Sequence, residues 1–587
     1  MDQRNLLLAI VLSVAILVAF QYVFEKMRPV PPPTPAPATA TQTAPSTPAP
    51  AGASPGVAAP EVIAPATTAG GTAMAPTPET REVALAEQPR VRINTPRLHG
   101  SIALKGGRID DLTLATYHDT VDPKSAEVVL LWPTGTKDPY FAEFGWVAGT
   151  AGTKVPGTDT QWSASGGPLT PTSPVTLRWD NGAGLIFTRA ISVDENYMFT
   201  VRDTVKNTGT TPVNLLPYAL ISRTGTPPGS SYYISHEGLV GYVGGTVIPS
   251  GVITDNDTFA HLTPDKPRNY SSTGGWLGFT DKYWLATLVP DQNATIKAGF
   301  RHLVDNGIDR YQADVLGPET TVPAAGTAGA TTRLFAGAKE VQLLDAYRDS
   351  GIAKFDLAID WGLYYFLTKP IFLTLQFFYQ LLGNFGLAIL LLTLIIKLLF
   401  FPLANKSYSA MSKMKLLQPE MQKIRERFPE DKARQQQEIM ALYKKVGANP
   451  LAGCLPIVIQ IPVFFSLYKV LFVTIEMRHA PFFGWIHDLS APDPTSFANL
   501  FGLIPFTPPG VLMIGAWPLL MGVTMYLQQK LNPQPVDPVQ ARMFMLLPIV
   551  FTYMLSAFPA GLVIYWAWNN LLSIAQQWTI MHRAGAA

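Results

Sequence analysis

The sequence predicts a polytopic α-helical membrane protein that carries a large all-β domain outside the bilayer. Three observations lead to this fold class. Only 15% of the 587 residues are charged, against about 25% in soluble globular proteins, and 47% are hydrophobic. Long apolar runs lie near the N-terminus and after residue 360. The stretch between them alternates short apolar and polar segments with turn residues, as antiparallel sheets do.

The first apolar run, 6–24, is long enough for a transmembrane helix. A cleaved signal peptide is the alternative, but residues 19–22 offer no small-x-small cleavage site. We therefore expect residues 1–28 to form a retained membrane anchor. Residues 29–82 are almost entirely Pro, Ala, Thr, Gly and Ser, so they cannot bury a core and are predicted to form an extended tether.

Residues 83–347 show the pattern of an all-β domain. Short alternating runs such as 90–93 and 197–202 are separated by Asn-Gly, Gly-Gly, Thr-Gly and Pro-Gly pairs, which favour turns. This spacing predicts a sandwich or a barrel of antiparallel strands. Helical periodicity of useful length first occurs at 339–347, at the end of the domain.

The remainder of the chain is typical of a membrane protein. Segment 348–383 mixes aromatic residues, Lys369 and Pro370 with apolar residues, and we expect an amphipathic helix that lies in the membrane interface. A first core span is predicted at 384–402, and the block 455–580 is predicted to hold the rest. With the anchor this makes six transmembrane helices, five of them in the core; the last four are expected at 455–475, 512–529, 543–559 and 561–580.

Basic residues in the short connections set the predicted orientation. Segment 403–450 contains ten Lys or Arg residues, whereas segment 478–510 contains only Arg478. The basic segment is therefore expected in the cytoplasm. Both termini then also lie in the cytoplasm, and the β domain lies on the opposite side of the membrane.

Polar side chains within the predicted spans gather toward the cytoplasmic halves. Thr393 and Lys397 are four residues apart and therefore share a helix face. Because polar groups in hydrocarbon are costly unless they face water or one another, this bias suggests a hydrated cavity open to the cytoplasm. The alternative is ordinary polarity at helix ends with helix–helix hydrogen bonds. The other polar residues of the pattern include Gln460, Thr524 and Gln528.

Lys397 is the most informative of these residues. It precedes Pro402 by five residues, roughly 7.5 Å at the usual helical rise, so it could snorkel to the headgroups. No Asp or Glu occurs in the hydrocarbon stretch of any predicted span. An unpaired cation in a hydrated inner-leaflet pocket would instead attract an acidic segment of a visiting molecule.

Segment 403–450 is predicted to be a cytoplasmic helical hairpin that turns at 428–431. Its apolar residues recur at three- and four-residue steps and continue on the return helix. A Met-rich seam of this kind can be a plastic docking surface for apolar segments. Alternatively, the seam packs on itself and leaves a charged, solvated hairpin. The candidate docking residues are Met411, Met414, Leu417, Met421 and Ile424.

Neither catalysis nor a cofactor is predicted. The histidines outside the spans show no metal-ligand spacing, and the chain contains no Gly-x-Ser-x-Gly motif or phosphate-binding Gly-rich loop. The single cysteine, Cys454, excludes intramolecular disulfides. A net charge of +2 argues against nucleic-acid binding.

Several motifs in the second half of the chain resemble those of the YidC-type membrane protein insertases of Gram-negative bacteria. They occur in order at 449–456, 460–464, 483–490 and 558–565, where the sequence is NPLAGCLP, QIPVF, FGWIHDLS and FPAGLVIY. The sequence LLQP at 416–419 also fits. The order of anchor, tether, β domain and five-helix core is similar to that of the family along the whole chain.

The resemblance implies an insertase and folding chaperone that works independently of the Sec translocon or together with it. It would admit a transmembrane segment and its short tail into a hydrophilic inner-leaflet groove and release the segment sideways to lipid. Lys397 would be the groove cation, often Arg in the family, and Thr393 its polar partner. Trp566 would replace an aromatic residue that is often Tyr, beside a retained Tyr565. The rest of the expected groove is Gln460, Phe464, Thr524 and Gln528.

The resemblance also implies a location in the bacterial inner membrane. The β domain would be a periplasmic supersandwich similar to that of sugar mutarotases, although 83–335 shows no catalytic acid–base pair to carry sugar chemistry. Its end, around 339–347, would contact other envelope proteins. Expected partners are nascent membrane proteins, the lipid bilayer and the Sec translocon; the ribosome and the signal-recognition-particle receptor are further candidates.

Two rival functions remain open. A secondary transporter would require an acidic residue or an inverted repeat in the spans, and neither is found in the sequence. A membrane-anchored carbohydrate-binding protein would use the β domain as its active part, so removal of 83–335 would abolish function.

Overall fold

The computed structural model describes residues 79–225, 235–248, 259, 262–305, 307–362, 364–447, 455–532 and 538–583. All of the described residues belong to one compact unit, which lies within Val62–Ala587. The predicted anchor, the predicted tether as far as residue 78, and Cys454 lie outside the described residues.

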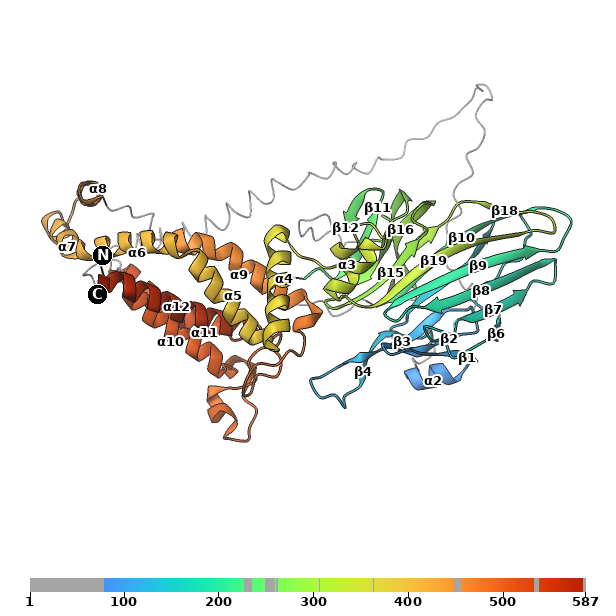
Figure 1. Ribbon diagram of the computed structural model, residues 1–587, viewed down its shortest axis with the longest axis horizontal. Helices are drawn as coiled ribbons and strands as arrows, with labels where there is room; N and C mark the ends of the chain where they lie inside the picture. Colours follow the sequence, from blue (N-terminus) through green and yellow to red (C-terminus); the bar gives the residue numbers. More distant parts are fainter. Residues whose placement is uncertain are drawn as a thin grey trace, which may run out of the picture. The chain divides into compact units, whose positions relative to one another are not determined.

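The first sheet of the β domain has ten strands, all of them paired antiparallel (Figure 1). Two short strands, β4 (Glu127–Leu131) and β18 (Thr320–Val322), pair with β3 and β10. The main order is β1 (Arg90–Asn94), β2 (Leu98–Ala103), β3 (Ile109–His118), β5 (Tyr140–Ala148), β10 (Val213–Thr224), β17 (Ile308–Leu316), β16 (Thr295–Asp305) and β13 (Arg268–Thr273).

The second sheet has nine antiparallel strands. Burial alternates along β8, as expected for a strand with one face on a core. The order is β12 (Thr246–Ile248), β11 (Gly238–Val243), β14 (Trp276–Thr280), β15 (Trp284–Pro290), β19 (Thr327–Ala338), β9 (Met198–Asn207), β8 (Leu185–Val193), β7 (Val175–Asp180) and β6 (Ser163–Ser165).

A fully buried cation links the two sheets. Arg189 on β8 pairs with Asp203 on β9, with 2.7 Å between Nε and Oδ1, and donates a 2.6 Å hydrogen bond from Nη2 to the carbonyl of Phe144 on β5. Such a buried charge is tolerated only because its donors are satisfied. The expected all-β domain is thus confirmed, as two packed sheets. A six-residue helix, α2 (Arg81–Ala86), precedes them.

Three helical segments connect the β domain to the helices that follow. They are α3 (Val341–Asp349), a 3₁₀ turn η3 (Phe355–Ala358) and α4 (Tyr365–Leu382). Lys369 of α4 forms ion pairs with Asp345 of α3 and Asp356 of η3, so the charged side of α4 faces these elements. Its exposed side chains are mostly apolar, including Phe366, Leu373, Phe377 and Leu381.

The second half of the chain is helical. Asn384 caps α5 by accepting a hydrogen bond from the amide of Leu387. The 3₁₀ turns η5 (Ile475–Met477), η6 (Phe497–Gly502) and η7 (Gly510–Leu512) lie between α9 and α10. The helices are α5 (Phe385–Leu399), α6 (Phe401–Leu416), α7 (Gln418–Arg427), α8 (Lys432–Val446), α9 (Leu455–Val473), α10 (Ala516–Leu531), α11 (Pro538–Leu555) and α12 (Ala560–Arg583).

The predicted span 384–402 differs from the structure at its C-terminal end. Helix α5 ends at Leu399, and Pro402 lies in the first turn of α6, where the missing amide hydrogen costs no helical hydrogen bond. Among the described helices, none alone has both the length and the hydropathy of a membrane span, and α5 and α6 reach them only together, across a bend of 67°. The count of six transmembrane helices therefore stays a prediction.

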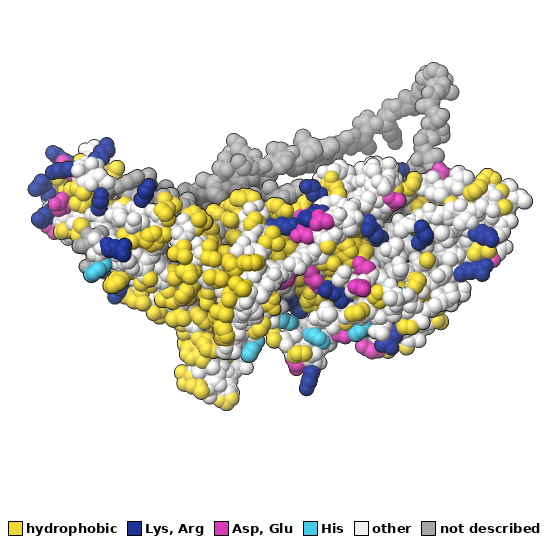
Figure 2. Space-filling model, viewed as in Figure 1, with side chains coloured by type: hydrophobic (Ala, Val, Ile, Leu, Met, Phe, Trp, Pro, Cys, Tyr) yellow, Lys and Arg dark blue, Asp and Glu magenta, His cyan; other side chains and the backbone are white. Residues whose placement is uncertain are grey.

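The surface of the helical half is largely apolar. Figure 2 shows hydrophobic side chains gathered over the helices, whereas Lys and Arg side chains gather at α7 and α8. Exposed apolar side chains occur on α5, α10 and α11; they include Leu398, Leu399, Val523, Leu527, Ile549 and Val550.

Candidate functional site

Helix α12 is the element around which the predicted groove residues are arranged. It packs against α5, α6, α9 and α10, and these helices and α12 carry every candidate groove residue. One face of α12 presents polar side chains to its neighbours, because Asn570, Ser573 and Gln577 follow one another at three- and four-residue steps. All three are almost fully buried.

Lys397 reaches from α5 to this face. Its Nζ donates a 2.8 Å hydrogen bond to Oγ of Ser573, whose hydroxyl donates to the carbonyl of Asn569 at 2.8 Å. The lysine is half-buried, and within the described part of the chain no carboxylate pairs with it. The structure therefore gives the cation a neutral partner. We call Lys397 and Ser573 the Lys397 site.

Thr393 is not joined to Lys397 by a hydrogen bond. Its side chain is buried, and its hydroxyl donates at 2.7 Å to the carbonyl of Ile389 on its own helix. The four-residue spacing places the two residues one turn apart on α5. The threonine hydroxyl thus has its hydrogen-bond partner within its own helix, as is common for threonine in helices.

Gln460 and Tyr565 are brought together between α9 and α12. The amide of Gln460 donates to the hydroxyl of Tyr565, which is buried at 2% exposure. Phe464 lies one turn further along α9 and packs edge-on against Trp566, with 4.7 Å between ring centroids. Phe551 of α11 also contacts Trp566, with 6.0 Å between ring centroids. These contacts tie α9, α11 and α12 together through aromatic rings.

Thr524 and Gln528 lie on α10. Thr524 is buried, accepts a 3.3 Å hydrogen bond from the amide of Asn570 and donates at 2.8 Å to the carbonyl of Met521. Gln528 follows one turn later and is half-buried. The α10–α12 interface continues toward the helix ends, where the amide of Gln577 donates to the side chain of Asn532 at 3.0 Å.

Asn570 and Ser573 belong to the polar pattern that the sequence shows near the cytoplasmic end of the last span, but they are not among the predicted site residues. The signal that could have found them is the spacing of Trp566, Asn570, Ser573 and Gln577, which puts an aromatic ring and three polar groups on one helical face. Such polarity near a helix end has an ordinary alternative explanation in the membrane interface, so the spacing alone does not single them out.

The residues of the predicted hairpin seam belong to two separate hydrophobic clusters. Leu417 and Met421 are buried against Ile439, Leu442 and Tyr443 of α8; the Tyr443 hydroxyl contacts Sδ of Met421 at 3.4 Å. Met414 contributes to this cluster, and Ile424 is half-buried. Met411 instead packs with Tyr408 against Ile580 of α12. Met414 also packs against this second cluster, so it contacts both groups.

The β domain is joined to α9 and the turn after it by polar contacts. Nζ of Lys469 lies 2.5 Å from Oδ2 of Asp360, and the amide of Val341 donates a 2.9 Å hydrogen bond to Glu476. Burial acts to raise the pKa of Asp360, but the adjacent Lys469 ammonium outweighs burial and holds this pKa below its ordinary value.

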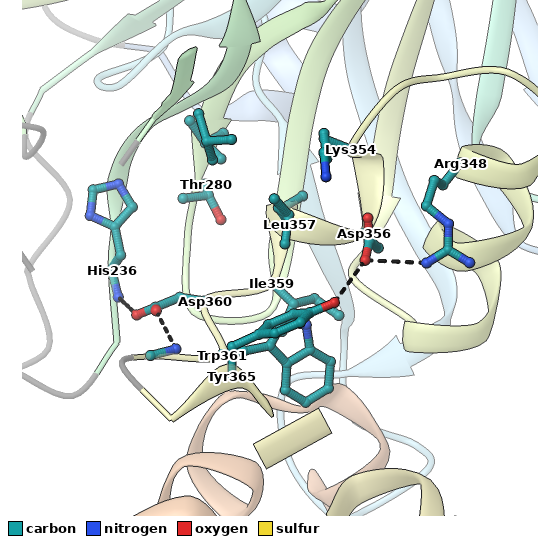
Figure 3. Close-up of a pocket in the computed structure, with 14 residues that line it drawn as sticks. His236, Thr280, Arg348, Lys354, Asp356, Leu357, Ile359, Asp360, Trp361 and Tyr365 are labelled. Carbon is teal, nitrogen blue, oxygen red and sulfur yellow. Dashed lines mark hydrogen bonds and ion pairs between the residues drawn. The ribbon is translucent and has the colours of Figure 1, made fainter. Parts of the chain in front are cut away.

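A cavity of about 540 Å³ lies beside this junction (Figure 3). Asp360 receives a 3.2 Å hydrogen bond from the amide of His236, and Asp356 pairs with Arg348 at 3.2 Å. Both carboxylates are therefore held in ion pairs, Asp360 with Lys469 and Asp356 with Arg348 and Lys369. These two carboxylates of the cavity therefore join structural elements.

Two family models match successive parts of the chain. The YidC periplasmic domain model matches residues 90–374, and the 60Kd inner membrane protein model matches residues 377–586.

Relatives of similar length are named membrane protein insertase YidC. The one from Methylobacterium radiotolerans is 51% identical over 606 residues, covering 100% of this chain and 95% of its own length. The one from Methylorubrum extorquens is 52% identical over 595 residues, covering 100% and 96%. Among solved structures, an active YidC insertase with its first transmembrane domain resolved is 18% identical with a TM-score of 0.36, covering 83% of this chain and 92% of that one.

Proposed function

Since the chain belongs to the YidC family of membrane protein insertases, which are inner-membrane proteins with a periplasmic domain and not enzymes, we propose how it inserts its substrates. A substrate's transmembrane segment and its short flanking tail enter a polar path in the inner leaflet at the Lys397 site. The segment then leaves sideways into lipid. The family assignment made from the sequence motifs is confirmed by these relatives.

The proposed topology has six transmembrane helices, with both termini in the cytoplasm and the β domain in the periplasm. The basic residues of 403–450 support a cytoplasmic position for α6, α7 and α8. Exposed apolar side chains on α5, α10 and α11 support contact of these helices with lipid. The proposed domain limits remain 1–28, 29–82, 83–347, 348–383, 384–402, 403–450 and 455–580.

The observation that carries the proposal is the Lys397–Ser573 hydrogen bond. An ammonium beside a neutral hydroxyl has no negative partner in this pair, whereas a carboxylate partner would cancel its charge. An acidic tail that enters this site gains Coulomb attraction in a medium of lower dielectric than water. The attraction offsets part of the cost of bringing the tail into the membrane.

Apolar parts of the substrate need a separate path. We propose that they slide along α9 and α11, the third and fifth predicted transmembrane helices. Ile461 and Phe465 of α9 and Ile549 and Tyr553 of α11 are exposed and support this assignment. The apolar side chains along this path and the lipid acyl chains offer the segment similar contacts. The segment can therefore leave for the lipid without breaking a strong interaction.

The further partners follow from the proposed topology. The basic helices α7 and α8 would meet the ribosome and the signal-recognition-particle receptor on the cytoplasmic side, and the insertase would work alone or beside the Sec translocon. Leu417 and Met421 are buried within the hairpin, so docking would use the residues that remain exposed, such as Leu416 and Met440.

Site-specific photocrosslinking tests the proposed path. A photoreactive amino acid replaces Lys397 in one variant and Leu399 in the other, because Leu399 is on the same helix and is 71% exposed. A substrate with a neutral tail, whose insertion does not depend on the cation, is arrested before its tail crosses. It should crosslink to position 397 and much less to position 399. Equal crosslinking at both positions, or crosslinking at 399 alone, would contradict a path at Lys397.

One observation supports a carbohydrate-binding role. A cleft of about 1040 Å³ in the β domain is lined by His99, Glu127, Trp132 and Trp284 among others, a mixture that can bind sugars. If this were the main function, deletion of 83–335 would abolish activity; the insertase proposal expects insertion to survive in large part. A secondary transporter is not supported, because α5 and α9 to α12 contain no acidic residue.

A further inference from the structure

The chain between η5 and α10 contains a loop with unusually exposed apolar side chains. We call residues 497–512 the apolar loop; it includes η6 and η7. Leu503 is 84% exposed, and Leu500 is 53% exposed. In a protein surrounded by water, this much contiguous apolar surface is rare and marks a site of interaction. The other exposed apolar residues are Phe497, Phe501, Ile504, Phe506 and Leu512.

The loop and the helix that follows it are also poor in charged residues. From Thr495 to Gln529 the sequence contains no Asp, Glu, Lys or Arg. Interfaces between proteins have a charged or polar rim around their apolar centre. The space-filling view shows the apolar side chains of this loop, drawn as the orange segment before α10 in Figure 1, without a charged side chain among them (Figure 2).

The backbone of the loop satisfies many of its own hydrogen bonds. The Phe501 amide donates to the Ser496 carbonyl at 2.7 Å, and the Ile504 amide donates to the Asn499 carbonyl at 3.1 Å. The Asn499 side chain accepts from the Gly502 amide at 3.0 Å. Prolines at 505, 508 and 509 have no amide hydrogen to satisfy. These features lower the cost of placing an irregular loop against lipid.

The base of the loop is fixed to α10. Asp493 accepts hydrogen bonds from Nε1 of Trp485 at 3.1 Å, from the Thr495 amide at 3.0 Å and from the Trp517 amide at 2.9 Å. Ser496 donates to the Leu512 carbonyl at 2.7 Å and so closes the loop. Asp493, the acidic residue nearest to the loop, is thus buried, and its carboxylate is occupied by these hydrogen bonds. The apolar tip of the loop extends from this hydrogen-bonded base.

We propose that the apolar loop inserts its side chains into the periplasmic leaflet, at the boundary between headgroups and acyl chains. Its occupant is lipid, because the loop continues into α10, whose residues Leu520, Val523 and Leu527 are also exposed and apolar, in a chain that matches an inner membrane protein family. A position in the membrane interface suits a loop whose backbone is irregular but whose side chains are apolar. The inference rests on the proposed topology, which puts the loop on the periplasmic side.

The consequence concerns the bilayer beside the insertase. A wedge of apolar side chains in the outer leaflet anchors the start of α10 at a fixed depth. It also displaces lipid from that leaflet on the side opposite to the Lys397 site. Local thinning of this kind shortens the distance that a polar tail must cross.

Depth-dependent fluorescence quenching tests the inference. The single native cysteine is replaced (Cys454→Ser), and one cysteine is introduced for an environment-sensitive dye, giving Leu503→Cys, Ile549→Cys or Asp122→Cys in the full chain. Ile549 is exposed on α11 within a proposed span, and Asp122 is exposed in the β domain. Each labelled protein is reconstituted into phosphatidylcholine–phosphatidylglycerol vesicles with or without nitroxide-labelled lipid.

The dye at 503 should be quenched by nitroxides near the headgroups and shielded from aqueous iodide, while the dye at 122 should show the opposite. Iodide quenching without lipid quenching at 503 would overturn the inference. Shielding from both quenchers would also overturn it, because protein, for example a second copy, would then cover the loop. The dye at 549 separates the two proposals. If nitroxide-labelled lipid does not quench the dye at 549, the proposed topology fails. If it quenches the dye at 549 but not the dye at 503, only the loop assignment fails.

Discussion

Lys397 on α5 donates a 2.8 Å hydrogen bond to Ser573 on α12, 176 residues later in the chain. The contact brings a cation from the first half of the helical region to the polar face of the last helix. No carboxylate among the described residues neutralises it. The hydrogen bond therefore fixes the position of a cation that no described carboxylate of the chain cancels.

Lys397→Met should impair the insertion of substrates according to the charge of their translocated tail. Loss of the cation removes the attraction for acidic tails, so these substrates should insert several-fold less efficiently, while neutral tails should change little. Protease protection of a tail series measures this. Lys397→Arg should restore the acidic substrates, because it keeps the charge.

Ser573→Ala is the matched control for the same site. It removes the hydrogen-bond partner but keeps the charge, so it should affect acidic tails less than Lys397→Met does. If Lys397→Met reduced all substrates equally, the charge would have no role in substrate selection.

Tyr565→Phe should destabilise the α9–α12 interface. The change removes the acceptor for the Gln460 amide, and a polar group left without a partner costs about 1 to 3 kcal/mol. Thermal unfolding in detergent measures the loss. Tyr553→Phe on α11 is the control, because Tyr553 is exposed and its hydroxyl should be dispensable. Equal effects of the two changes would argue that the Gln460 contact does not stabilise the fold.

Met421→Ala should loosen the cytoplasmic hairpin. Met421 is 8% exposed in the cluster that joins α7 to α8, and truncation of a buried methionine costs about 2 to 5 kcal/mol. Limited proteolysis should therefore cut near 428–431 faster than in the wild type. Met440→Ala, at an exposed position on α8, should leave the rate unchanged. Unchanged cleavage in both variants would mean that the seam is not what holds the hairpin.

The junction at Glu476 should make stability depend on pH. Burial raises the pKa of Glu476 to about 7 from an ordinary 4.5, although the hydrogen bond from the Val341 amide acts to lower it, and nearby Glu340 raises it further. The folded protein then binds more protons than the unfolded chain between these values, so stability falls as pH rises from about 4.5 to 7. The loss should be on the order of 1 to 3 kcal/mol.

Glu476→Gln tests this dependence, because glutamine stays neutral and can still accept from the Val341 amide. The difference in melting temperature between variant and wild type should grow in favour of the variant from pH 5 to pH 8. Glu438→Gln, at an exposed position of the hairpin, should show no such trend. A pH-independent difference for Glu476→Gln would mean that the carboxyl does not titrate in this window.

The class of the β domain was predictable from sequence, but its topology was not. The alternation of Leu185, Phe187, Ile191 and Val193 is visible in the sequence of β8 and matches its burial. The pairing of β5 with β10, or of β9 with β19, joins segments far apart in the chain. No local pattern specifies such partners, since loop closure and packing decide them.

The helical contacts show the same limit. The ion pair of Lys469 was not predicted from the sequence, because its partner Asp360 lies 109 residues earlier, beyond the reach of helical spacing. The apolar periodicity of the hairpin predicted one continuous seam, but Met411 packs against Ile580 of α12, whereas Leu417 and Met421 pack against α8. Spacing predicts which residues share a face of one helix; it does not predict which neighbour that face meets.

Insertion by the purified chain alone tests the central claim most directly. The protein is reconstituted into proteoliposomes, and a short single-span substrate with an acidic tail is added. The account predicts that the tail becomes protected from external protease above the level of empty liposomes, and that Lys397→Met lowers this protection. No protection with wild-type protein shown to be folded would contradict autonomous insertion through the Lys397 site.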